Sequence, residues 1–145
     1  AALIGIPPPI PPDAAAVFVA SDGPLGPDLL VMMQAHLAGV EADREIIVPY
    51  AALMQVSQQM RELYEHSRQA MRAEFLEVLG ARLGRADPLM LGILTDIIIM
   101  TCHTAFELWL SGDEPRIRDA LNRTWTVMTQ ASALLSRGEA PFGNG

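Results

Sequence analysis

The chain has 145 residues, half of them hydrophobic and 19% charged, which is enough for one domain with a buried core and excludes disorder over most of its length. Its formal net charge is −7, and its ten basic residues are all arginines spread along the chain. A basic surface that holds nucleic-acid phosphates is therefore not expected. The single cysteine, Cys102, excludes an intrachain disulfide, and no cysteine–histidine spacing indicates zinc.

A proline-rich lead-in occupies residues 1–12, where proline fixes extended backbone and removes amide donors. It has no basic residue before its prolines, so a signal peptide is not predicted. Asp13 is a candidate N-cap for a short helix that ends before Gly23. After a turn at residues 24–27, helical spacing of apolar residues predicts a second helix over residues 28–40.

The middle of the chain begins with an ambiguous segment, residues 42–49, which fits either a short helix or an extended buried piece. We expect a short helix that is broken at Pro49. Residues 50–83 then predict one long amphipathic helix, with an apolar stripe on one face and Gln, Glu and Arg on the other. Gly80 or Gly84 is expected to end it.

The most apolar stretch of the chain is residues 88–110, which is hydrophobic on nearly every side. Asp87 as N-cap, Pro88 at the first position and Gly112 after the end mark it as a helix. A helix that is apolar all round must be surrounded by its own domain or by a partner. It is long enough to cross a bilayer, but three ionisable groups within its span favour a cytoplasmic protein with no membrane role. A final amphipathic helix is predicted from Asp113 or Pro115 to residue 137, followed by a flexible tail, 138–145.

The three ionisable residues of this central helix are Asp96, His103 and Glu107, at positions i, i+7 and i+11. This spacing places them along one stripe, where they would supply the few polar contacts of an otherwise apolar cavity. Two alternatives stay open: a histidine buried and hydrogen-bonded to Glu107, or a metalloenzyme that uses His103 and Glu107 with a third ligand from elsewhere.

Enzyme chemistry is not expected. Cys102 does not face its neighbour His103, because adjacent helical residues point about 100° apart. The chain also shows no serine–histidine–aspartate order and no glycine-rich phosphate loop. We predict neither a metal site nor a cofactor.

Three stretches, residues 51–84, 87–112 and 113–135, give the order of a long amphipathic helix, an all-apolar helix with Trp109 near its glycine stop, and a closing amphipathic helix. Over residues 13–137 this order resembles the C-terminal ligand-binding and dimerisation domain of TetR-type transcriptional regulators. The resemblance implies an all-α bundle of five to six helices, whose last two long helices form a four-helix bundle in a homodimer. It also implies a pocket for a small, mostly apolar effector. Operator DNA would be bound only through an N-terminal helix-turn-helix domain, which residues 1–12 do not supply.

The eight methionines suit an adaptable apolar pocket, because methionine fills irregular spaces. The residues predicted to bind the ligand are Met33, Leu37, Tyr50, Met54, Met71, Phe75, Asp96, Met100, His103, Thr104 and Glu107. The residues predicted for the dimer interface are Ile97, Ile98, Ile117, Leu121, Trp125 and Met128. The alternative function is a stand-alone helical small-molecule-binding protein without a DNA-binding role.

Overall fold

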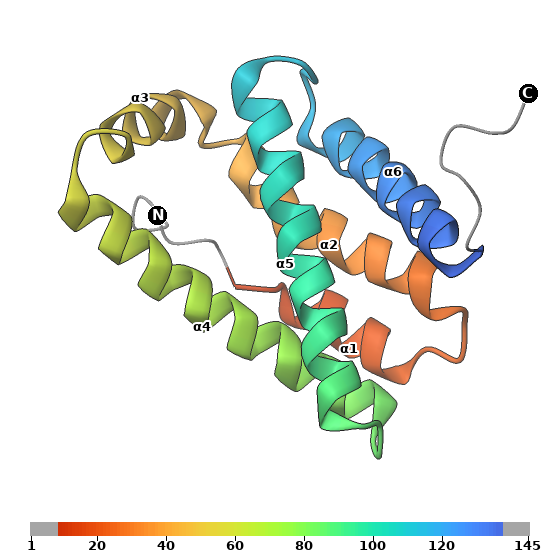
Figure 1. Cartoon of the computed structure of the whole chain (residues 1–145). Helices are drawn as coiled ribbons and strands as arrows, with labels where there is room; N and C mark the ends of the chain where they lie inside the picture. The colour runs from red at the N-terminus through yellow and green to blue at the C-terminus, as the bar shows by residue number, and fades with distance from the viewer. Residues whose placement is uncertain (1–8, 138–145) are drawn as a thin grey trace, which may run out of the picture.

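A computed structural model describes residues 9–137, and these residues form helices and no strand, which confirms the predicted all-α class (Figure 1). The helices are α1 (Pro12–Ala20), α2 (Leu25–Glu41), α3 (Arg44–Met54), α4 (Gln58–Leu83), α5 (Pro88–Ser111) and α6 (Ile117–Arg137). The predicted tail, 138–145, and residues 1–8 of the predicted lead-in lie outside the described residues.

The central element is α5, which packs against α4 on one side and α6 on the other (Figure 1). The second helix, α2, packs on α6 and α5, and α1 packs on α2 and α4. The inner side of α5 is buried, including Ile98, Cys102 and Trp109. Its outer side is not covered, since Leu89 and Ile93 are about 70% and 49% exposed. The subunit therefore surrounds α5 only in part.

Both ends of α5 form as the sequence predicts. The Asp87 carboxylate accepts a hydrogen bond from the Leu89 amide at 2.9 Å, and Pro88 takes the first helical position. Gly112 ends the helix in the left-handed region, with φ +85°. An L side chain there meets steric strain, which explains why glycine suits this position.

We expect Gly112→Ala to lower the free energy of unfolding by about 1 kcal/mol, because alanine is strained in the left-handed region. Its Cβ would meet nothing within 4 Å, so no clash adds to this cost. The matched control is Gly39→Ala in α2, where the added Cβ also meets nothing within 4 Å. This control should instead stabilise the protein by up to about 1 kcal/mol, because alanine has the higher helix propensity. Urea unfolding of both variants measures the difference, and equal effects would contradict the account.

Several predicted boundaries are wrong. Pro11 precedes α1, so Asp13 lies in its first turn, and no side chain caps that helix. The second helix begins at Leu25 rather than at residue 28. Pro49 lies inside α3, which continues to Met54. Proline removes one backbone donor, and the carbonyl it leaves free belongs to Glu45, an exposed residue that water can reach.

The predicted long helix over residues 50–83 is two helices with a break at residues 55–57. Ser57 caps α4 by accepting a hydrogen bond from the Met60 amide at 3.4 Å. The first residues of the predicted long helix thus belong to α3. The last helix begins at Ile117, after the predicted start at Asp113 or Pro115. The break matters because it sets α3 apart as a short helix of its own.

The end of the predicted lead-in is part of the core. Ile10 is buried, and its amide donates a hydrogen bond to the Glu74 carboxylate of α4. The predicted domain boundary after residue 12 therefore lies too late. Burial of this one isoleucine holds residues 9–11 across the bundle.

By length and composition, α5 is able to cross a bilayer, and 33% of its most apolar window is buried in the structure. The core helix of a water-soluble protein passes the same test, so this is weak support for a membrane span. The cytoplasmic location stays a prediction.

Candidate functional site

The predicted polar stripe lies on the surface where α4 and α5 meet. Arg72 of α4 donates to the Asp96 carboxylate at 2.8 Å, and the Tyr64 hydroxyl lies 3.1 Å from His103 Nδ1. His103 Nε2 lies 3.0 Å from a Glu107 carboxylate oxygen. The Asp96 and Glu107 side chains are each 65% exposed. Contrary to the prediction, these residues do not line an enclosed cavity, and they instead join α4 to α5.

The chain of contacts from Tyr64 through His103 to Glu107 has the order of a proton relay, but its electrostatics do not favour one. Burial raises the pKa of Tyr64, and the Glu107 and Glu65 carboxylates add to the rise while Arg68 opposes it. The hydroxyl thus stays protonated and does not act as a phenolate nucleophile. Paired in this way, His103 matches the alternative of a histidine bonded to Glu107, although it is not buried.

Cys102 is not poised as a nucleophile. Burial raises the pKa of Cys102 to about 12, which keeps the thiol protonated and unreactive. Between residues 9 and 137, no three His, Cys, Asp or Glu side chains gather closely enough to hold a metal ion. Met100 and Thr104, which were also predicted to bind the ligand, are exposed and half-buried respectively.

Some of the other predicted ligand residues do come together. Met33 of α2 and Phe75 of α4 are buried in the core, and Met71 of α4 packs against it. Met71 and Phe75 contact His36 of α2, which sequence reasoning did not select. We call the group formed by Met32, Met33, His36, Met71 and Phe75 the α2–α4 seam.

His36 is the one polar side chain of the seam and is only 1% exposed. Its Nε2 lies 3.2 Å from the Met71 sulfur, and its ring meets Phe75 edge to face, with centroids 5.2 Å apart. Its Nδ1 is buried and has no hydrogen-bond partner among the described residues. Burial lowers the pKa of His36 to about 4, and the nearby Pro9 carbonyl opposes the shift. The imidazole is therefore neutral at pH 7.

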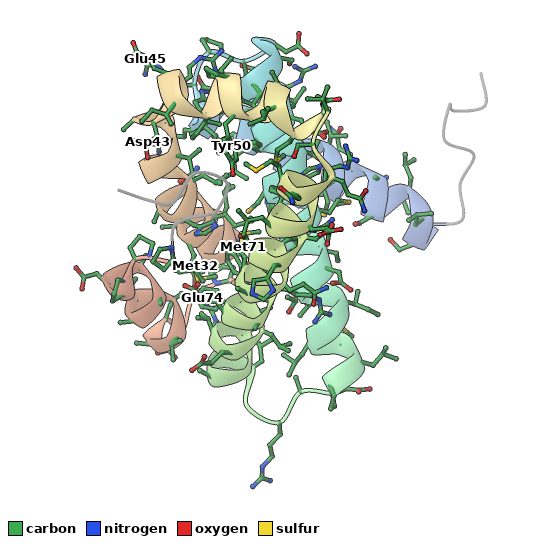
Figure 2. All side chains as sticks on the ribbon, turned by 90° about the vertical axis from the view of Figure 1, so that its left-hand side faces the viewer. Met32, Asp43, Glu45, Tyr50, Met71 and Glu74 are labelled. Carbon is green, nitrogen blue, oxygen red and sulfur yellow. The ribbon has the colours of Figure 1, made fainter. Side chains whose placement is uncertain are left out.

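The third helix, α3, packs on α4 and has no buried residue. Figure 2 shows Tyr50 on the inner side of α3, with Met32 and Met71 lying below it between α2 and α4. The Tyr50 hydroxyl is 3.9 Å from the Met60 sulfur, which is a weak contact. Tyr50 and Met54 are both half-buried, so their predicted position beside the ligand site is compatible with the fold.

The start of α3 is held more firmly. Arg44 donates to the Trp109 backbone carbonyl at 2.9 Å, and its guanidinium lies 4.9 Å from the centre of the Trp109 ring. The Trp109 indole nitrogen is buried and has no partner among the described residues. The start of α3 is therefore tied to α5, whereas no residue of α3 is buried.

A hollow of about 350 Å³ lies between α2 and α6, apart from the seam. Its lining residues are Val31, Gln34, Ala35, Leu37, Ala38, Glu41, Ile117, Arg118 and Leu121. Leu37, predicted for the ligand site, thus faces this hollow. Ile117 and Leu121 were predicted for the dimer interface.

Half of the predicted dimer residues are core residues of the subunit. Ile98, Ile117 and Leu121 are each no more than 2% exposed, so they do not reach a surface that a second subunit could cover. Ile97, Trp125 and Met128 are half-buried and stay compatible with an interface. The uncovered apolar side chains lie instead on the outer side of α5, at Leu89, Met90, Ile93 and Met100. We call these four residues the outer α5 face.

Comparison of the chain with protein-family models, with curated proteins and with solved structures finds no match. Any function must therefore be argued from the fold and the seam.

Proposed function

We propose that this chain is the effector-binding and dimerisation domain of a TetR-type regulator, and that it binds a small, mostly apolar ligand. The observation that carries this proposal is the α2–α4 seam, where a buried histidine with an unpartnered nitrogen sits among methionines. Ligand sites are mainly apolar, with a few polar groups that fix orientation. The weakly packed α3 beside α4 supports it, since a helix without buried residues gives way at low cost.

The homodimer is supported by the outer α5 face. Leu89, Ile93 and Met100 recur at spacings of four and seven residues, which places them on one side of the helix. All four side chains of the face are about half exposed or more. Contiguous exposed apolar residues of this kind mark an interaction surface. A second copy of the chain covers this face in the proposed dimer, with α6 beside it.

We expect the protein to be a dimer at micromolar concentration, and Ile93→Glu to weaken the dimer by about 100-fold, because the interface would bury an unpaired charge. Multi-angle light scattering over a dilution series measures both. The control is Val17→Glu on α1, an exposed apolar residue away from α5 at 67% exposure, which should leave the dimer intact. A monomeric wild-type protein would contradict the proposed dimer.

The effector is tested separately. Organic extraction of the purified protein, followed by mass spectrometry, should release a small apolar molecule. Operator binding, in this proposal, depends on a helix-turn-helix encoded upstream of residue 1, and the gene sequence decides that point. If no such segment precedes the domain, the same seam belongs to a stand-alone ligand-binding protein.

A further inference from the structure

We infer that His36 is the polar contact of the ligand site and that it selects a neutral ligand with a hydroxyl group on an apolar body. This inference rests on the proposed function, since it assigns the class of ligand to the same seam. It goes beyond an apolar effector because it excludes carboxylates and amines.

One ring nitrogen of His36 is free to bond to a ligand. Its Nε2 is engaged by the Met71 sulfur at 3.2 Å, whereas Nδ1 is buried without a partner of hydrogen-bond geometry, although the Pro9 carbonyl lies near the ring. A buried polar atom without a partner costs about 1–3 kcal/mol, which a ligand that bonds to it would relieve. Sulfur is a weak acceptor, so the tautomer with hydrogen on Nε2 leaves Nδ1 as an acceptor. A hydroxyl both donates and accepts, and it therefore matches Nδ1 in either tautomer.

The seam offers no counter-ion to a charged ligand. None of its five members is charged at pH 7, since His36 is held neutral by burial. Two charged residues of α4, Arg72 and Glu74, come between Met71 and Phe75 in the sequence, and both are already engaged. Arg72 pairs with Asp96, and Glu74 accepts from the Ile10 amide. A charged ligand group would thus enter an apolar site without a counter-ion, at a cost of several kcal/mol.

The methionines near His36 suit an apolar ligand body. Met32, Met33 and Met71 are unbranched and change shape easily, so they can repack around an apolar body. The seam is closed in this structure, and the ligand enters past α3, which has no buried residue. Tyr50 lies on the side of α3 that faces Met71 and adds an aromatic wall once the ligand has entered (Figure 2).

The test uses three probes that share one alkyl chain: 1-octanol, octanoate and octylammonium at pH 7.5. Isothermal titration calorimetry of the full chain should give at least about tenfold tighter binding for 1-octanol than for either charged probe. His36→Leu should weaken 1-octanol binding by about tenfold. His36→Gln, which keeps a donor and an acceptor, should stay within about threefold of wild type. His66→Leu on the exposed side of α4 is the control and should change nothing.

The outcomes separate the ligand class from the ligand site. Tighter or equal binding of a charged probe would overturn the inferred class while leaving a ligand site in place. Binding of 1-octanol that is unchanged in His36→Leu would overturn the role of His36. Failure of all three probes to bind would overturn this inference and the proposed effector-binding function together. Circular dichroism and urea unfolding of each variant show whether it is folded.

Discussion

Replacing Arg82 by methionine is expected to lower the free energy of unfolding by about 3 kcal/mol. The Arg82 guanidinium donates to the Asp28 carboxylate at 2.7 Å, to the Phe18 carbonyl at 3.1 Å and to the Gly23 carbonyl at 2.7 Å. It also lies 4.6 Å from the centre of the Phe18 ring, and its side chain is only 9% exposed. Methionine keeps the apolar stem but removes all three hydrogen bonds and leaves Asp28 with the Ser21 hydroxyl as its donor. Urea unfolding measures the loss.

The matched control is Arg85→Met, because Arg85 follows the same helix but is exposed. This variant should stay within about 0.5 kcal/mol of wild type. The pKa of Asp28 is a second measure of the lost contacts. The Ser21 hydroxyl, and to a smaller extent Arg82, hold the pKa of this carboxyl below its usual range. In Arg82→Met that pKa should rise toward its ordinary value. Equal stability of the two variants would show that Arg82 does not join α1, α2 and α4.

Acid should destabilise the protein through His36. The pKa of His36 is 6.5 in the unfolded chain and about 4 in the folded protein, because burial disfavours the charged ring. Between these two values the unfolded state binds more protons, so stability falls as the pH falls. This one group should remove about 3 kcal/mol between pH 7 and pH 4. Urea unfolding at a series of pH values measures the slope.

Carboxylates also titrate in this range, so the measurement is a difference between variants. His36→Leu should lose about 3 kcal/mol less than wild type over the same pH interval, because it has no buried imidazole to protonate. His66→Leu, at an exposed site, should follow the wild-type curve. Parallel curves for wild type and His36→Leu would mean that folding does not lower the pKa of His36, which would contradict its burial in an apolar site.

The sequence predicted the helices best where local chemistry marks their ends. Asp87, Pro88 and Gly112 bound α5 because capping and left-handed backbone are properties of single residues. The break between α3 and α4 was missed, since apolar spacing continues through it and only Ser57 signals a new start. At Pro49 the sequence predicted a break, but α3 continues through this residue. Its effect depends on whether water reaches one freed carbonyl, which sequence alone does not reveal.

The site was predicted only in part, because the sequence does not show which neighbouring helix a given face meets. Met33, Met71 and Phe75 all belong to the core or pack against it, because they lie on the inner faces of clear helices. The stripe of Asp96, His103 and Glu107 was also correctly seen as one line on α5. Which neighbour that line meets depends on how α4 and α5 are rotated, and it proved to be the surface of α4. His36 carried one available signal: it lies on the buried face of α2, four residues after Met32.

We propose that this domain is a dimer and that it binds a small apolar ligand in the α2–α4 seam around His36. Native mass spectrometry of the full chain, as purified and with 1-octanol added, tests both parts in one spectrum. We predict the mass of two subunits, carrying either a co-purified small molecule or one 1-octanol per subunit, and about tenfold weaker uptake of 1-octanol by His36→Leu. The mass of a single subunit that stays unliganded in excess 1-octanol would contradict the account.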